Sequence, residues 1–177
     1  MKAGKYRIVG LQATGKTTLG KLLKERGYVV YDVDHTDGLT VLKDRETGLY
    51  YTFDDVDYEP DGTINWEKYR YEMVEGRLKE LLKPNEPVFI VGSTRNAAES
   101  YSLFDKIFVL TIDADTMRKR LKTHEIITHH LDNEIERMTE NFDEKQRKLL
   151  LDSGKNSVVI DSTKSVEQVL NDILSKI

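Results

Sequence analysis

The stretch "GLQATGKTT", residues 10–18, decides the fold of this chain. It fits the pattern G-x-x-x-x-G-K-[ST], with Gly10, Gly15, Lys16 and Thr17 at the defining positions. The apolar run "YRIVG" leads into it and leucines at helical spacing follow it, which is the order of strand, loop and helix that the pattern requires. The stretch therefore predicts a loop that wraps around phosphate groups at the start of a helix.

Each residue type in this loop has a physical reason. Glycines let the backbone curl so that successive N–H groups point at phosphate oxygens, and the helix N-terminus adds partial positive charge. Lys16 can reach the outer phosphates, and the Thr17 hydroxyl can bind Mg²⁺. The residues expected to hold the nucleotide here are Gly10, Leu11, Gln12, Ala13, Thr14, Gly15, Lys16, Thr17 and Thr18.

Composition limits the class of protein. The chain has 177 residues, which suits a single domain over 1–177, and its net charge is −4. Mixed charges and net acidity argue against a nucleic-acid partner or a membrane-binding surface. The absence of cysteine excludes disulfides and thiolate metal sites. No apolar run is long enough for a secretory signal or a membrane span, so we expect a cytoplasmic protein, monomeric or homodimeric.

Apolar runs alternate with amphipathic segments along the chain. This alternation is typical of crossover units and predicts an α/β fold with a parallel sheet. The five expected strands are residues 6–10, 28–34, 88–92, 106–110 and 157–161.

The helices are predicted from apolar residues at steps of three and four. Expected helices follow the phosphate loop and cover residues 66–81, 97–103, a basic segment from 113 onward, a long segment marked by Ile135, Met138, Phe142 and Leu149, and a last helix from Ser165. Ser165 and Gln168 have the spacing of a capping box.

Two acids and one missing acid indicate which class of nucleotide protein this is. Motor-type and AAA-type ATPases carry an acid at the end of a core strand, but "VFIVGSTRN" has none. The D-x-x-G and N-K-x-D motifs of Ras-like GTPases are also missing. Instead, Asp32 and Asp34 end the strand that follows the first helix. Because the carboxyl ends of parallel strands share one crevice, both side chains should approach the phosphate loop.

On these residues the chain resembles the P-loop small-molecule kinases of the shikimate, gluconate, nucleoside and nucleotide kinase group. The resemblance covers nearly the whole length and rests on "GLQATGKTT", "YDVD", "VGS", the arginine-bearing helix after "KIFVLTIDADT", and "VVIDST". The chain also resembles unassigned kinase-like ATPases of bacteria and phages. The resemblance implies ATP and Mg²⁺ as cofactors, helices on both faces of the sheet in three layers, and the strand order 2-3-1-4-5.

The resemblance also implies roles for individual residues. Asp32 would help to hold Mg²⁺ together with Thr17, and Asp34 would accept the proton of the acceptor hydroxyl. Arg120 would lie against adenine or the phosphates, with Ser162 and Thr163 nearby, while Arg118 is a less specific match. The lid, at about 122–133, lacks the usual second arginine, which Arg137 or Arg147 could replace; a solvated helix face is an equal alternative for each.

The small-molecule acceptor is expected to bind next to an insert at about 35–64 and to the end of the third strand. His35, Arg45, Gly92, Ser93 and Arg95 are the candidates. Aromatic residues of the insert could stack on a ring, although their alternation favours packing within a small hairpin. Its acids Asp54, Asp55, Asp57 and Glu59 would repel a polyanion and favour a nucleoside or a small neutral acceptor. A metal site built from His129 and His130 is disfavoured, because adjacent side chains diverge.

We therefore expect an ATP-dependent kinase that transfers the γ-phosphoryl group to a hydroxyl of a small metabolite or nucleoside. Lys16, Asp34 and Arg120 are its expected catalytic residues. One alternative is a nucleoside monophosphate kinase, which needs phosphate-binding arginines such as Arg45 and Arg70. The other is a protein that binds ATP without turnover and acts in regulation or interaction, an alternative that the missing lid arginine supports.

Overall fold

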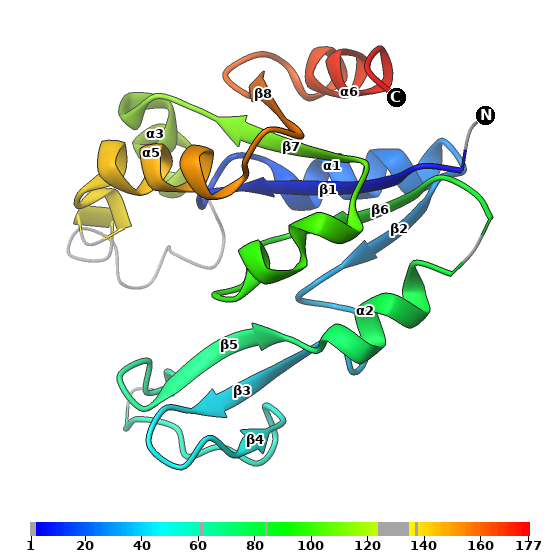
Figure 1. Ribbon diagram of the computed structural model, residues 1–177. Helices are drawn as coiled ribbons and strands as arrows, with labels where there is room; N and C mark the ends of the chain where they lie inside the picture. Colours follow the sequence, from blue (N-terminus) through cyan, green and yellow to red (C-terminus); the bar gives the residue numbers. More distant parts are fainter. Residues whose placement is uncertain (1–2, 61, 84, 124–134, 137) are drawn as a thin grey trace.

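The computed structural model describes residues 3–60, 62–83, 85–123, 135–136 and 138–177. Its centre is a five-stranded parallel sheet in the order β2-β6-β1-β7-β8 (Figure 1). Counted along the chain within this sheet, the order is 2-3-1-4-5, as the resemblance implies. The strands are β1 (Lys5–Gly10), β2 (Val29–Asp32), β6 (Val88–Val91), β7 (Lys106–Thr111) and β8 (Ser157–Asp161).

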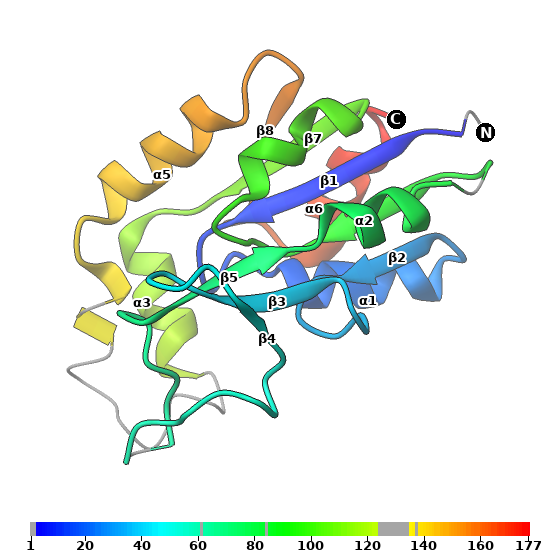
Figure 2. The ribbon, with the colours of Figure 1, turned by 60° about the horizontal axis from the view of Figure 1, so that its bottom comes forward.

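Two helical layers enclose this sheet. Helices α1 (Lys16–Glu25) and α6 (Val166–Leu174) pack on one face, where Leu19 and Leu170 join Ile8 in one buried cluster. The opposite face is covered by α2 (Glu75–Leu81), the 3-10 helix η1 (Ala97–Leu103) and α5 (Phe142–Asp152) (Figure 2). Helix α3 (Ala114–Lys122) follows β7 near the carboxyl edge. This is the expected three-layer α/β arrangement, and β1 lies at its centre.

A second, smaller sheet lies beside the main one. Strands β3 (Thr40–Asp44), β4 (Tyr50–Tyr51) and β5 (Tyr69–Met73) pair antiparallel in the order β4-β3-β5. The rings of Tyr51 and Tyr69 meet edge to face at 5.8 Å, and Tyr69 is buried. Tyr51 therefore packs within the small sheet as its alternation favoured, whereas Tyr50, Phe53, Tyr58 and Trp66 stay exposed.

The helix predicted over residues 66–81 is wrong in its first half. Only Glu75–Leu81 is helical, and Tyr69–Met73 is a strand paired with β3. The reason is that Tyr69, Tyr71 and Met73 also satisfy the period of two for a strand. Pairing with β3 supplies the backbone hydrogen bonds that a helix would otherwise make. Propensity and spacing alone could not distinguish these two outcomes.

The long helix expected from the spacing of Ile135 to Leu149 is interrupted: Ile135, Glu136, Met138 and Thr139 are helical, but Glu140 and Asn141 are in a turn. Helix α5 begins at Phe142, because Asn141 has a φ of 52°, in the left-handed region. Among the described residues, no helix is long and apolar enough to cross a membrane.

The cap of the last helix is confirmed. The Ser165 hydroxyl accepts a hydrogen bond from the backbone N–H of Gln168, and the Gln168 side chain accepts one from the backbone N–H of Ser165. This box fixes the start of α6, which contributes Val166 and Val169 to the pocket described below.

Replacing Ser165 with alanine should lower the free energy of unfolding by about 1 kcal/mol, since the first turn loses its side-chain acceptor. Urea denaturation followed by circular dichroism measures this loss. Ser165→Asp keeps a capping oxygen and should retain most of the stability. Equal losses in both variants would show that the cap does not stabilise α6.

Candidate active site

The phosphate loop leaves the end of the central strand and enters α1. Ala13 and Gly15 have φ of 59° and 88°, so two left-handed residues curl the backbone around an open centre. The hydroxyl of buried Thr14 donates to the Leu11 carbonyl at 2.9 Å and braces the curl from inside. A Cβ at Gly10 would lie 2.5 Å from the Thr14 hydroxyl oxygen and 3.0 Å from the Leu110 carbonyl oxygen. Glycine is therefore needed at position 10 for close packing and at position 15 for its dihedral angle.

Lys16 folds back over this loop. Its Nζ donates to the carbonyls of Gly10 at 3.0 Å and Leu11 at 2.8 Å. Burial lowers the pKa of Lys16 to about 8, while the nearby carboxylates of Asp34 and Asp32 act to raise it. The amine is thus still mainly a cation at neutral pH, and it is held by two carbonyls that a phosphate oxygen could replace.

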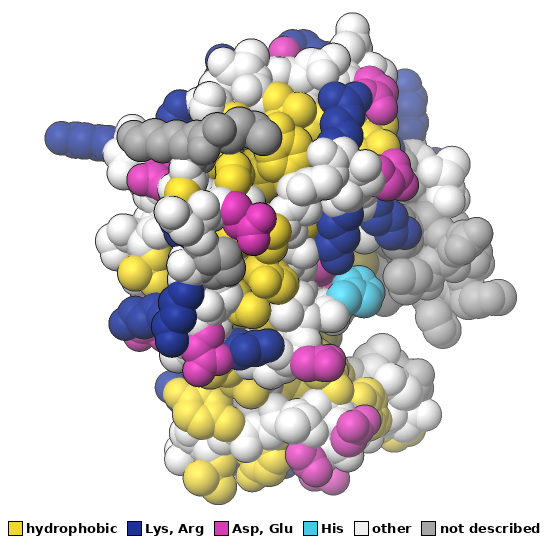
Figure 3. Space-filling view, turned by 90° about the vertical axis from the view of Figure 1, so that its right-hand side faces the viewer, with side chains coloured by type: hydrophobic (Ala, Val, Ile, Leu, Met, Phe, Trp, Pro, Cys, Tyr) yellow, Lys and Arg dark blue, Asp and Glu magenta, His cyan; other side chains and the backbone are white. Residues whose placement is uncertain are grey.

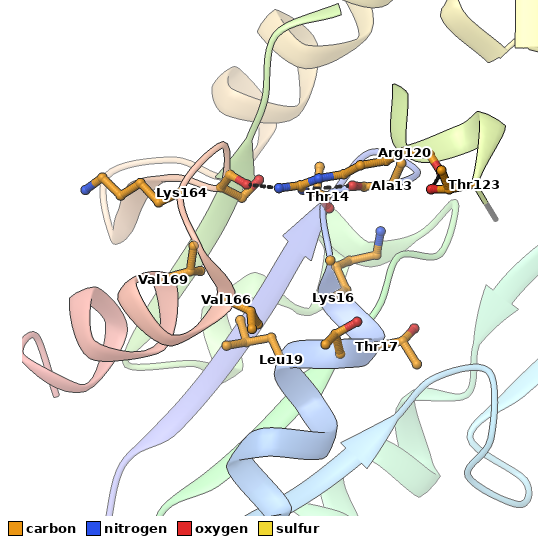
Figure 4. A pocket seen from close by; sticks show the side chains of 13 residues that line it. Ala13, Thr14, Lys16, Thr17, Leu19, Arg120, Thr123, Lys164, Val166 and Val169 are labelled. Atoms are coloured by element: carbon orange, nitrogen blue, oxygen red, sulfur yellow. Dashed lines mark hydrogen bonds between the residues drawn. The ribbon is translucent and has the colours of Figure 1, made fainter. Parts of the chain in front are cut away.

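A pocket of about 350 Å³ opens next to the loop (Figure 4). On one side, the Arg120 guanidinium donates to the Ala13 carbonyl at 3.1 Å and the Ser162 carbonyl at 2.6 Å. On the other side lie apolar side chains at the start of α6. The lining residues are Ala13, Thr14, Gly15, Lys16, Thr17, Thr18, Leu19, Arg120, Thr123, Ser162, Lys164, Val166 and Val169. Its polar wall at the loop and its apolar wall at α6 match the two halves of a nucleotide, phosphates and base.

The expected nucleotide residues divide into two groups in this pocket. Residues 13–18, Arg120 and Ser162 line it. Gly10, Leu11, Gln12 and Thr163 are not among the lining residues, and the Thr163 hydroxyl donates to Asp161 at 2.7 Å. Sequence reasoning missed Lys164, Val166 and Val169 as pocket residues. Their position directly after "VVIDST" was the available signal.

The acids of the second strand lie at the expected edge of the sheet. Asp32 accepts a hydrogen bond from the backbone N–H of Asp34 at 2.9 Å, and the His35 Nδ1 lies 3.4 Å from the same carboxylate oxygen. Both carboxylates act on the pKa of Lys16, so they lie near the phosphate loop. β2 ends at Asp32, and Val33 and Asp34 lie in the turn that follows, with Val33 buried and Asp34 exposed.

Asp34 has a partner that sequence reasoning missed. The Tyr71 hydroxyl, from β5 of the small sheet, lies 2.8 Å from Asp34 Oδ1 and 2.9 Å from the Val33 carbonyl oxygen. Burial raises the pKa of Tyr71, and the Asp34 carboxylate adds to this, so the hydroxyl stays protonated and can donate. The small sheet thereby orients the carboxylate that faces the loop. Tyr71 was hidden because its segment was predicted to be helical.

Removing this hydroxyl should slow turnover while leaving nucleotide binding intact. For Tyr71→Phe we expect kcat to fall roughly fivefold, since about 1 kcal/mol of orientation is lost at an exposed carboxylate. Calorimetric affinity for ATP should be unchanged. Tyr50→Phe, which removes an exposed hydroxyl from the same small sheet, is the matched control. A weakened ATP affinity in Tyr71→Phe would place this residue in the nucleotide site instead.

The candidates at the end of β6 have different positions. The Ser93 hydroxyl donates to the Gly10 carbonyl at 3.1 Å and ties this edge to the phosphate loop. A Cβ at Gly92 would lie 2.2 Å from Val33 Cγ2, so only glycine fits there. Arg95 is exposed, and its backbone N–H donates to the Tyr71 carbonyl at 2.9 Å.

Other candidates are turned away from the loop or lie outside the described residues. Arg45 donates to the carbonyls of Tyr69 and Trp66 within the small sheet. Arg118 pairs with Asp115 on its own helix, and Arg147 is exposed. The lid beyond Thr123, with His124, His129, His130 and Arg137, lies outside the described residues. Within the described part of the chain, no three histidine or acidic side chains form a metal cluster.

Comparison with known proteins identifies the family. A family model described as "AAA domain" matches residues 7–146, which is more than half of the chain. The chain belongs to this family. In the sequence, the lack of an acid at the end of "VFIVG" argued against an AAA-type ATPase. The family match shows that a chain without this acid can still belong to the family.

Individual relatives are kinases. The chain is 28% identical over 139 residues to an "Adenylate kinase isoenzyme 6 homolog" from Plasmodium falciparum (isolate 3D7), covering 73% of this chain and 70% of the relative. The fold of this chain matches that of a shikimate kinase from Bacteroides thetaiotaomicron, with a TM-score of 0.57 and 14% identity. The match covers 98% of this chain and 99% of the kinase. The fold also matches a deoxyadenosine kinase from M. mycoides, solved with bound dATP, with a TM-score of 0.52, 15% identity, and 97% and 98% covered. The fold is that of the P-loop kinase group.

Proposed function

We propose that this protein is an ATP-dependent kinase that transfers the γ-phosphoryl group to a hydroxyl of a small molecule. One observation carries the proposal: Asp34, bonded to Tyr71, lies near the Lys16 amine at the edge where the phosphate loop opens. A carboxylate placed beside a phosphate site can act on a hydroxyl that attacks phosphorus. The kinase relatives support the same reading.

The nucleotide would lie across the pocket beside α1. Backbone N–H groups of residues 13–18 would bind the phosphates, and Lys16 would exchange its two carbonyl partners for phosphate oxygens. The base would lie between Arg120 and the valines of α6. Thr17 and Asp32 fit a Mg²⁺ ion, because this ion takes few protein ligands when phosphates supply the others. When bound, the ion neutralises charge on the phosphates.

Asp34 would orient the acceptor and take its proton. The acceptor oxygen forms a bond to the γ-phosphorus while the bond from that phosphorus to the β–γ bridging oxygen breaks. ADP leaves with the electron pair of the broken bond, and the acceptor proton moves to the Asp34 carboxylate. Lys16 supplies positive charge to the equatorial oxygens, while Arg120 stays bonded to the Ala13 and Ser162 carbonyls beside the base.

The direct experiment is transfer from γ-labelled ATP to a panel of acceptors: nucleosides, nucleoside monophosphates, hydroxy acids and sugars. Label should appear on at least one acceptor in wild type and on none in a Lys16→Ala variant. ATP binding without transfer to any class of acceptor would instead favour a regulatory, non-catalytic protein.

The adenylate kinase relative favours one second candidate, a nucleoside monophosphate kinase. This activity needs cations for the monophosphate, yet Arg45 is bonded to carbonyls of the small sheet and Arg70 is exposed. Labelled nucleoside diphosphate as the main product of the same panel would select this candidate.

A further inference from the structure

Arg7 is the unexplained cation of the core. It lies on β1, the central strand, with no accessible surface. None of its Nε, Nη1 and Nη2 atoms has a hydrogen-bond partner in the structure. A buried guanidinium has five N–H donors, and each donor that loses water without a partner weakens the folded state. No acceptor among the described residues bonds to this group, so its donors are left for an anion from outside the chain.

The face on which Arg7 lies follows from the strand register. Arg7 pairs with Ile90 of β6 and Ile107 of β7, and both belong to the cluster under η1 and α2. Tyr6 and Ile8, its chain neighbours, belong to the cluster under α1 and α6. Arg7 therefore points away from α1 and toward the side where the small sheet lies. It does not line the nucleotide pocket.

The polar groups around Arg7 are those of the expected acceptor side. Burial lowers the pKa of Arg7 to about 10, while Tyr101, Asp34, Asp32 and Tyr71 act to raise it. The side chain thus remains a cation at neutral pH. Tyr71 and Tyr101 both pack against the cluster that surrounds it, and Tyr71 is the residue that bonds Asp34. Arg7 and Asp34 therefore lie on the same side of the sheet and act on each other electrostatically, and Tyr71, which bonds Asp34, lies in the same cluster.

We infer that Arg7 binds an anionic group, a carboxylate or a phosphate, on the molecule that presents its hydroxyl to Asp34. This inference rests on the proposed kinase function and narrows its acceptor to small hydroxylated anions. A guanidinium matches either anion with two parallel hydrogen bonds, which is the geometry that its free donors allow. Because Arg7 is fully covered, side chains of the surrounding cluster must shift before the anion reaches it.

The charge of the surrounding surface favours a small anion over a polyanion. A hollow separates the small sheet from the main body, and acidic side chains lie on the small sheet (Figure 3). Asp54, Asp55 and Asp57, in the segment between β4 and β5, are exposed. These acids would repel a polyanion more strongly than a group with a single carboxylate or phosphate.

The test compares wild type with Arg7→Met by thermal unfolding in increasing phosphate or glycerate, with chloride at equal ionic strength and glycerol as the neutral control. Arg7→Met should be at least as stable as wild type without added anion, because an unpaired buried charge is removed. Phosphate or glycerate should raise the unfolding midpoint of wild type more than that of Arg7→Met. The anion that gives this difference shows whether Arg7 binds a phosphate or a carboxylate. Phosphate that binds at the phosphate loop raises the unfolding midpoint of both proteins, so it does not change the difference between them.

Two further variants complete the test. Arg7→Lys keeps the charge without the planar fork and should give an intermediate response; it also serves if Arg7→Met does not fold. Arg77→Met, which removes a half-buried arginine that pairs with Glu80 on α2, should behave as wild type. The inference is overturned if the anions act equally on wild type and Arg7→Met, or if Arg7→Met is less stable than wild type in chloride.

This readout is independent of turnover. An Arg7-dependent anion response without transfer to any acceptor would reject the kinase proposal and keep the anion site. Where an acceptor is found, Arg7→Met should raise its KM at least about tenfold and leave the KM for ATP unchanged. Equal use of neutral and anionic acceptors by both proteins would reject the anion site and keep the kinase.

Discussion

Replacing Lys16 with alanine is expected to reduce phosphoryl transfer by at least about 100-fold to 1,000-fold, the effect of removing one charged group from a phosphoryl transition state. The Lys16 amine lies within the phosphate loop, where it donates hydrogen bonds to the Gly10 and Leu11 carbonyls. ATP affinity should fall as well, because the outer phosphates lose their cation. Label transfer from γ-labelled ATP and calorimetric titration measure the two effects.

The control for this variant is Lys21→Ala, which removes an exposed lysine from the same helix. It should keep both the rate and the affinity of wild type. The Lys16→Ala protein should fold normally, because burial of its amine opposes the charged state rather than stabilising the fold. Unchanged transfer by Lys16→Ala would mean that the loop binds a nucleotide for another purpose.

Replacing Asp34 with asparagine is expected to lower kcat by about 10² to 10⁴, the usual contribution of a positioned general base. The amide keeps the shape of the carboxylate and can still accept the Tyr71 hydrogen bond, but it cannot take a proton. ATP affinity should change little, since Asp34 is not among the residues that line the nucleotide pocket. The contrast with Lys16→Ala, which loses both, separates acceptor chemistry from nucleotide binding.

Asp37→Asn, an exposed acid three residues further along the chain, is the matched control. It should retain full transfer. If Asp34→Asn retained it too, the acceptor hydroxyl would lose its proton elsewhere, and the bond between Tyr71 and Asp34 would only stabilise the contact of the small sheet with β2.

Local chemistry made much of this site predictable. The loop residues are constrained by the dihedral angle of Gly15 and the contact of Gly10 with Thr14, so a pattern of a few letters specifies them. Arg120 lines the pocket beside this loop, bonded to the Ala13 and Ser162 carbonyls, and its contact with a nucleotide stays a prediction. The strand order also agrees with the order implied by the resemblance to kinases, because the rules for crossover connections leave few ways to build such a sheet.

The segment around Tyr71 shows where sequence reasoning failed. Its apolar residues satisfy helical and strand periods alike, and pairing with β3, some 30 residues earlier in the chain, selects the strand. The contact between Tyr71 and Asp34 spans 37 positions and has no local signal. Arg7 also has no local signal: an arginine within a strand sequence does not reveal that it is fully buried without a hydrogen-bond partner.

The sequence by itself determined the phosphate loop, the α/β class and the acids that end the second strand, because each depends on neighbours within a few residues. Only the tertiary structure decided what surrounds those acids: a tyrosine from the small sheet and a buried arginine from the central strand. Contacts of this kind come from strand pairing and packing between distant segments, and no local pattern encodes which side chains will meet.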